Sequence, residues 1–187
     1  MGEEYLRSVE AVTHEPAMQP DAIPRIDLYM DQVTTLLERE LGATKRSEED
    51  KIMTKTMINN YSKEKLLPAS QKKKYSRHHI LLLALIYEYK QILSINDIHT
   101  LLAPLIDDPE GLEAFYQTYL ERDAAQKELL QRVLAQETSD DLRLIASTLV
   151  TRASLEKRLA ERLLDHIVET EKHGPESSEP QNKMKGS

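Results

Sequence analysis

The sequence contains no cysteine among its 187 residues. Disulfides, thiolate nucleophiles and cysteine-ligated zinc or iron–sulfur clusters are therefore excluded. The sequence also lacks a glycine-rich phosphate loop, the Gly-x-Ser-x-Gly motif of serine hydrolases and any convincing set of nucleophile and base. We therefore expect a protein that is not an enzyme and that uses no cofactor.

Glycine and long apolar runs are also scarce. With only five glycines in the chain, helices are favoured over a sandwich or barrel, whose many turns need glycine. The longest apolar run, residues 80–86, is far shorter than the roughly 20 residues that cross a bilayer. Residues 1–10 include three glutamates and no apolar segment of a signal peptide. We expect an all-α, cytoplasmic protein that does not contact membranes.

Positive charge is scarce overall but is concentrated in one segment. The whole chain has a net charge of −7. Residues 51–91, which we call the basic island, hold nine lysines or arginines and two glutamates, a net charge of +7 that leaves −14 for the rest. This distribution predicts a localised contact with a polyanion and a separate acidic body.

The first half of the chain predicts a small helical domain. Residues 1–22, with Pro16 and Pro20, are expected to form an irregular lead. Beyond them, apolar residues recur at three- and four-residue spacing, which is typical of amphipathic helices. Residues 80–86 are apolar on all sides, so their helix is expected to lie at the centre of the core. The predicted helices cover residues 24–41, 54–66, 76–91 and 94–102, and the last three are expected to have Thr54, Ser76 and Ser94 as N-caps.

The second half predicts two long amphipathic helices. A polar, proline-containing boundary at residues 104–109 precedes them, and Thr138-Ser139 separates them, which favours an antiparallel hairpin. The predicted domains are therefore a lead (1–22), a DNA-binding domain (23–104), a dimerisation or regulatory hairpin (105–173) and a disordered tail (174–187). The apolar stripe of the second long helix is expected to be buried against the N-terminal domain or against a second copy, and it consists of Leu142, Ile145, Leu149, Leu159, Leu163 and Ile167.

The basic island has the pattern of a winged helix-turn-helix. A short helix ends abruptly at Leu-Leu-Pro and is followed by a lysine-rich loop and a buried helix. The short helix would enter the major groove, where asparagine binds adenine through two hydrogen bonds. The loop lysines would contact phosphates. The predicted DNA-binding residues are Thr54, Lys55, Asn59, Asn60, Tyr61, Lys63, Lys72, Lys73, Lys74, Tyr75 and Arg77.

Several of these residues also have simpler interpretations. The three consecutive lysines fit a solvated loop, and the asparagine pair fits an ordinary polar helix face. Tyr61 fits a position packed on the third helix with its hydroxyl free for a phosphate. Arg77 fits either a local ion pair with Glu64 or a phosphate contact.

Two further patterns in the sequence have better explanations than a metal site or an effector pocket. His166, Glu169 and His173 share helical spacing, but a solvated helix end explains them better than a metal site. The aromatic residues Tyr87, Phe115, Tyr116 and Tyr119 are better explained by core packing than by a small-molecule pocket. We therefore expect no metal, and the sequence identifies no effector.

Three segments resemble a known family. Pro24-Arg-Ile-Asp-Leu-Tyr-Met-Asp-Gln, Met57-Ile-Asn-Asn-Tyr and Lys72-Lys-Lys-Tyr-Ser-Arg resemble the bacterial domain of unknown function 1836. The resemblance covers residues 23–102, about the size of a single small domain. The label of that family names no function.

A more distant resemblance is to the MerR-type regulators. Tyr61, the Leu-Leu-Pro of residues 66–68 and Tyr75 match the end of their recognition helix and their wing, although MerR proteins usually have Arg-Tyr at Asn59-Asn60 and glycine at Lys65. This resemblance implies a DNA-binding regulator that dimerises through a C-terminal helix. We therefore expect a homodimeric, sequence-specific regulator of transcription that binds double-stranded DNA, more a repressor than an activator. The alternative is a protein-interaction module whose basic island or acidic hairpin binds a protein partner.

Overall fold

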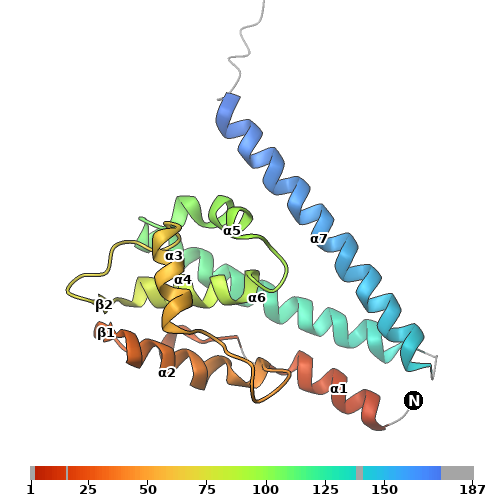
Figure 1. Cartoon of the computed structure of the whole chain (residues 1–187). Coiled ribbons are helices and arrows are strands. Elements are labelled where there is room, and N and C mark those ends of the chain that lie inside the picture. The colour runs from red at the N-terminus through yellow and green to blue at the C-terminus, as the bar shows by residue number, and fades with distance from the viewer. Residues whose placement is uncertain (1–2, 16, 138–140, 174–187) are drawn as a thin grey trace, which may run out of the picture.

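The computed structural model describes residues 3–15, 17–137 and 141–173, and these residues are mainly helical (Figure 1). The prediction of a predominantly α-helical protein is confirmed, and no helix in the described ranges is long and apolar enough to cross a membrane. Two short strands pair antiparallel, with Leu28 opposite Tyr75 and Tyr29 opposite Lys74. The elements are α1 (Glu3–Thr13), β1 (Leu28–Tyr29), α2 (Met30–Leu41), α3 (Lys55–Lys63), β2 (Lys74–Tyr75), α4 (Arg77–Tyr89), α5 (Ile95–Leu102), α6 (Pro109–Ala135) and α7 (Leu142–His173).

Helix α4 lies at the centre of the main core, as predicted. Every residue from His79 to Tyr87 is buried, because this stretch is apolar on all sides and is covered on all sides. Residues of α2, α3, α5 and the sheet pack around it in a single core. The N-cap of the helix is Ser76, whose backbone N–H donates a hydrogen bond to Nδ1 of His79 at 3.2 Å.

The main core continues into the first half of α6. Leu112 and Tyr116 are buried in the same core as α4, and the Tyr116 hydroxyl donates a hydrogen bond to the carbonyl of Met18 at 2.8 Å. The predicted boundary after residue 104 therefore does not separate two cores. The polar residues there mark a turn at the surface, and α6 returns across α4.

The prediction of an irregular lead over residues 1–22 was wrong, because α1 occupies Glu3–Thr13. The two prolines follow this helix in the sequence and do not interrupt it. The Tyr5 hydroxyl donates a hydrogen bond to the carbonyl of Leu134 at 3.1 Å. Tyr5, Leu134 and Ile145 are buried together in a second, small core, which we call the junction cluster.

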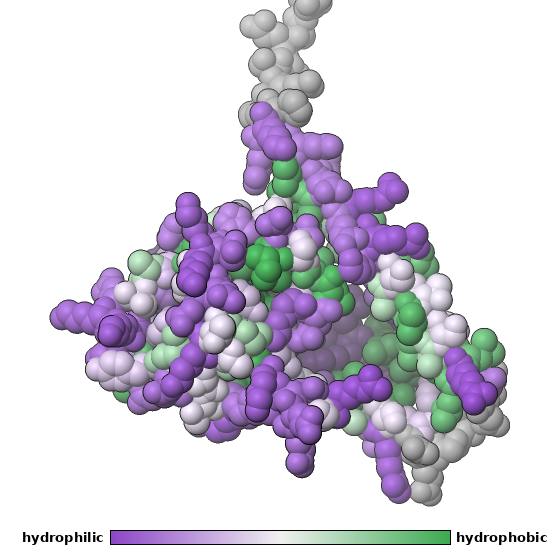
Figure 2. Space-filling model, viewed as in Figure 1, coloured by the Kyte–Doolittle hydropathy of each residue, from purple (hydrophilic) through white to green (hydrophobic). Residues whose placement is uncertain are grey.

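Helices α6 and α7 do not form the closely packed hairpin that the sequence predicted. They meet at the junction cluster and then diverge, and α7 packs further along on α5 (Figure 1). A cleft of about 1120 Å³ lies between α7, α6 and the end of α4, and Figure 2 shows the hollow. Of the six residues predicted to form the buried stripe of α7, only Ile145 is buried. The other five are between 37% and 60% exposed. The predicted disordered tail lies outside the described residues.

Candidate nucleic-acid interface

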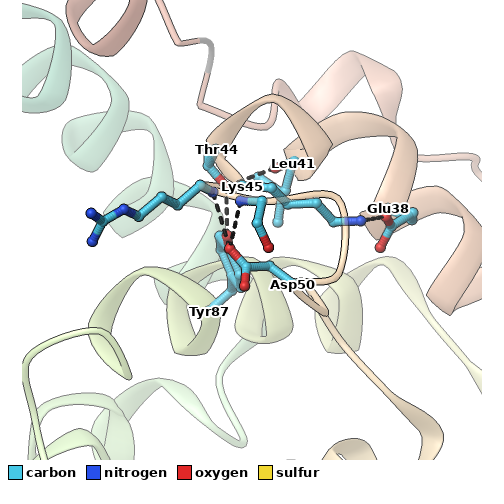
Figure 3. Close-up of polar contacts among 8 residues, drawn as sticks. Glu38, Leu41, Thr44, Lys45, Asp50 and Tyr87 are labelled. Carbon is cyan, nitrogen blue, oxygen red and sulfur yellow. Dashed lines mark hydrogen bonds and ion pairs between the residues drawn. The ribbon is translucent and has the colours of Figure 1, made fainter.

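The segment between α2 and α3 is held in place by polar contacts (Figure 3). Thr44 Oγ1 lies 2.5 Å from the Tyr87 hydroxyl of α4 and donates a hydrogen bond to the Leu41 carbonyl at 2.7 Å. The Asp50 carboxylate accepts hydrogen bonds from the backbone N–H groups of Ser47, at 3.0 Å, and Arg46, at 3.1 Å. The Ser47 N–H is the main reason that the pKa of Asp50 lies below its usual value. These contacts fix the start of α3 relative to α4.

Lys90 provides a second anchor for this segment. Its ammonium donates a hydrogen bond to the Ile52 carbonyl at 3.0 Å and lies 4.8 Å from the centroid of the Tyr87 ring. Burial lowers the pKa of Lys90. This lysine belongs to the basic island by sequence, but in the structure it supports the fold.

Helix α3 has a buried face and an exposed polar face. Its N-cap is Thr54, whose hydroxyl accepts a hydrogen bond from the Met57 N–H at 3.2 Å, as predicted. Ile58 and Tyr61 are buried and fix the helix on the core. The opposite face exposes Lys55, Asn59, Asn60 and Lys63. Among the residues that the structure describes, neither asparagine side chain makes a hydrogen bond, so both amides face solvent with their donors and acceptors free.

Helix α3 ends in a Schellman motif with lysine at the left-handed position. Leu66 N–H donates to the Tyr61 carbonyl at 2.9 Å, and Lys65 N–H donates to the Ser62 carbonyl at 3.2 Å. Lys65 has φ 57°, a conformation that favours glycine. Leu66 and Leu67 are buried directly after it. The abrupt Leu-Leu-Pro stop therefore turns the chain away from α3 and leaves Lys65 exposed.

A tight turn of four residues, 71–74, follows; we call it the basic turn. Lys74 N–H donates to the Gln71 carbonyl at 2.9 Å, and the two central residues, Lys72 and Lys73, have φ values of 50° and 63°. Two positive φ values are typical of a type I′ turn, where asparagine and glycine are preferred. The turn exposes both lysine side chains. Of the described residues other than glycine, only Lys65, Lys72 and Lys73 have positive φ values.

The sheet attaches the basic turn to α2. Strand β2 follows the turn and pairs with β1, which leads directly into α2. Lys74 lies 5.1 Å from the centroid of the Tyr29 ring, so its charge is held against the sheet. The sequence predicted helix from residue 24 and missed β1. A two-residue strand has too few positions to show alternation, so the sequence carried no signal for it.

The predicted DNA-binding residues fall into two groups. Those on α3 and the basic turn are mostly exposed, whereas Tyr61 and Tyr75 are buried in the core. Arg77 also points inward: it forms an ion pair with Glu113 of α6 at 2.6 Å and donates a hydrogen bond to the Pro20 carbonyl at 2.6 Å. Its suggested local pair with Glu64 is not formed. The exposed group contains Lys55, Asn59, Asn60, Lys63, Lys72 and Lys73.

Most of the exposed lysines have no carboxylate partner. Lys55 pairs with Asp31, but Lys63, Lys65, Lys72 and Lys73 form no ion pair with any residue in the described ranges. The sequence prediction did not include Lys65 among the site residues. A signal was present, because the MerR-type regulators usually have glycine at this position. Hydrophilic residues cover the surface over α3 and the segment leading to β2, on the left of Figure 2. This surface lies at the end of the molecule away from α1 and the junction cluster (Figure 1).

No metal site is found in the parts of the chain that the structure describes, where no three histidine, aspartate or glutamate side chains are grouped to hold an ion. The side chain of His173, the third member of the triplet considered in the sequence, lies outside the described residues.

The comparisons with known proteins give a family without an assigned activity. The family model described as Domain of unknown function (DUF1836) matches residues 18–119, more than half of the chain. The match extends the resemblance seen in the sequence at both ends and includes the part of α6 that packs on α4. No curated protein matches the chain. No solved structure matches it either.

Proposed function

The chain belongs to the family of domain of unknown function 1836, and because that label names no activity, we propose a function from the surface of α3 and the basic turn. We propose that the protein is a sequence-specific DNA-binding regulator of transcription that acts as a homodimer. Repression requires only that the protein occupies its operator, so we propose repression rather than activation.

The observation that carries the proposal is the set of four exposed lysines without carboxylate partners around the end of α3. In a chain with a net charge of −7, unpaired cations gathered in one short segment favour a polyanionic ligand. Two of them, Lys72 and Lys73, are held in a backbone conformation that costs on the order of 1 kcal/mol or more for each residue. Such strain is concentrated at functional sites. We propose that this ligand is the phosphate backbone of DNA, which lysine side chains contact without reading sequence.

Helix α3 supplies what base recognition needs. It presents its polar face outward and is about as wide as the major groove, which admits one helix. Asn59 and Asn60 have free amides on that face, and asparagine reads adenine through two hydrogen bonds. In this proposal α3 reads bases while the basic turn holds the backbone, an arrangement similar to the recognition helix and wing of the MerR-type regulators. Arg77, Tyr61 and Tyr75 support the fold and are not part of the proposed contact.

The proposal is tested by fluorescence anisotropy with DNA from upstream of the protein's own gene, against random competitor DNA, across a salt series. The double substitution Lys72→Ala/Lys73→Ala is expected to flatten the log–log salt slope by about two units, because each lost phosphate contact removes about one. The matched control is Arg122→Ala/Arg132→Ala, which removes the same charge from the exposed surface of α6. This control is expected to keep the wild-type slope.

Base reading has its own test in the same assay. Asn59→Ala/Asn60→Ala is expected to reduce the preference for the specific DNA by about tenfold or more while leaving non-specific binding and its salt slope unchanged. Equal loss on specific and random DNA would contradict a base-reading role for α3. If no DNA binds even at low salt, the proposal fails, and a pull-down experiment then tests the alternative of a protein partner for the basic surface.

A further inference from the structure

Residues 155–167 of α7 include a row of exposed large apolar side chains. Leu155, Leu159, Leu163 and Ile167 are 55%, 60%, 58% and 39% exposed. Their four-residue spacing places them side by side along the helix, and we call them the leucine row. The neighbouring Leu164 is buried, and α7 packs on α5, so the helix is anchored to the body while the leucine row faces outward. Green residues are visible among purple ones along this helix in Figure 2.

A set of charged residues runs along one edge of the leucine row. Arg158, Arg162, Asp165 and Glu169 stand at positions i, i+4, i+7 and i+11, which is one face of a helix. All four side chains are exposed, and none forms an ion pair with a described residue. We call them the charged edge. Elsewhere on α7, the pairs Arg152–Glu156 and Lys157–Glu161 neutralise each other within the helix.

The order of basic and acidic residues along the charged edge favours one partner and one direction of pairing. Along the chain it has two basic residues and then two acidic ones. A second copy running in the opposite direction presents acidic residues opposite the basic ones, whereas a parallel copy presents like charges. Charges along the edges of paired helices set orientation in this way. We infer that α7 pairs with α7 of a second copy, antiparallel and centred near Leu163, with Arg162 of each copy facing Asp165 of the other.

The surface available suits a modest, reversible dimer. Each side chain of the leucine row exposes on the order of 100 Å², so two copies bury about 800 Å² of apolar surface. The aliphatic stems of the charged edge add to this and bring the contact toward the lower end of the range for specific interfaces, about 1,200 Å². The inference rests on the homodimer of the proposed function, and it names the surface and direction of pairing.

The absence of cysteine in the chain allows a direct test by crosslinking. In full-length protein, Leu163→Cys is expected to form a disulfide-linked dimer under mild oxidation, because residue 163 of the two copies meets at the centre of the antiparallel pair. Leu155→Cys is the matched control. The two copies of residue 155 would lie about 26 Å apart along the helix axis, well beyond disulfide reach. Equal crosslinking of both variants indicates parallel pairing and overturns the inference.

Charge reversal gives a second test that leaves the core of the monomer untouched. Arg162→Glu is expected to weaken the dimer about tenfold in analytical ultracentrifugation, because it creates two like-charged contacts across the symmetry axis. Asp165→Arg is expected to do the same. The double variant Arg162→Glu/Asp165→Arg restores the opposite charges and is expected to return to within about threefold of wild type. A double variant as weak as either single variant overturns the inference.

Comparison with the DNA assay separates this inference from the proposed function. A wild-type chain that is monomeric at every concentration but binds specific DNA overturns the pairing and the homodimer, and leaves the proposed DNA-binding function in place. A chain that crosslinks through Leu163→Cys but binds no DNA supports the pairing, and the proposed function fails.

Discussion

At the scale of single residues, the structure uses lysine where the backbone favours glycine. Lys65, Lys72 and Lys73 all have positive φ values, and all lie in the short stretch between α3 and β2. The sequence predicted the lysines as charges but did not show their conformation, because backbone dihedral angles follow from the turn geometry and not from residue type alone. Lys65 was the exception, since glycine is usual at the corresponding position of the MerR-type regulators.

Lys65→Gly is expected to stabilise the protein by about 0.5–1 kcal/mol, because glycine adopts the left-handed conformation of the Schellman motif without steric cost. The free energy of unfolding from urea denaturation measures the effect. The control is Lys65→Ala, which removes the charge but keeps the Cβ atom. Stabilisation by alanine to the same extent would mean that charge repulsion, and not φ, is relieved.

His79 is a titratable side chain that is buried in helix α4. Its Nδ1 accepts the Ser76 N–H at 3.2 Å, and its Nε2 lies 3.2 Å from the Pro68 carbonyl, so the neutral ring with hydrogen on Nε2 fits both partners. Burial lowers the pKa of His79 below 6.5. The unfolded chain therefore binds a proton more readily than the folded chain. The contribution of His79 to the free energy of unfolding is fully present above pH 6.5. It is lost as the pH falls below that value toward the lower folded-state pKa.

His79→Gln is expected to make the free energy of unfolding less dependent on pH between 7 and 5. Glutamine supplies an uncharged acceptor for the Ser76 N–H, as in a capping box, and does not titrate. Urea denaturation at a series of pH values measures the slope, and the difference at pH 8 gives the cost of the substitution itself. An unchanged slope would show that other groups determine the acid sensitivity.

At the scale of elements, helices with a regular apolar period were predicted well. The apolar run of residues 80–86 and the caps at Thr54 and Ser94 located α4, α3 and α5, because local hydrogen bonds and burial agree there. Helix α1 was missed because its stability comes from a distant contact, the packing of Tyr5 on Leu134. The inward position of Arg77 was missed for the same reason, since Glu113 is 36 residues away.

Arg77→Gln is expected to lower the free energy of unfolding by about 1 kcal/mol and to leave the proposed DNA binding unchanged. The side chain connects α4 to α6 and to the Pro20 carbonyl, and the ion pair is partly exposed, with 32% and 40% of the two side chains accessible, so screening by water limits its contribution. Thermal unfolding measures the first effect and the anisotropy assay the second. A loss of DNA affinity in the folded variant would mean that Arg77 contributes to DNA binding.

At the scale of the whole molecule, burial is unevenly distributed. The main core surrounds α4, whereas α7 touches the rest of the described chain at the junction cluster and at α5. The sequence predicted both long helices but not their divergence. An amphipathic stripe shows that a helix needs an apolar partner and does not show which partner it has. The family match, residues 18–119, covers the main core and stops before α7.

Hydrogen exchange is expected to follow this distribution. In the Leu163→Glu variant, where pairing is removed, amides of α4 should exchange at the rate of global unfolding and those of α7 much faster. Peptide-level mass spectrometry measures both. In the wild type, added protection confined to residues 155–169 is expected from pairing. Protection of α7 equal to that of α4 in the variant would contradict the weak attachment of α7.

The divergence of α7 also makes it a long lever. Its 32 residues extend about 48 Å, so a tilt of about 5° at its start carries its far end about 4 Å. In a dimer paired near residue 163, about 32 Å along α7, the same tilt shifts each copy by about 3 Å, which is close to one base-pair step of about 3.4 Å. If the proposed function holds, the angle of α7 determines which spacing of half-sites the protein accepts, independently of the base contacts proposed for α3.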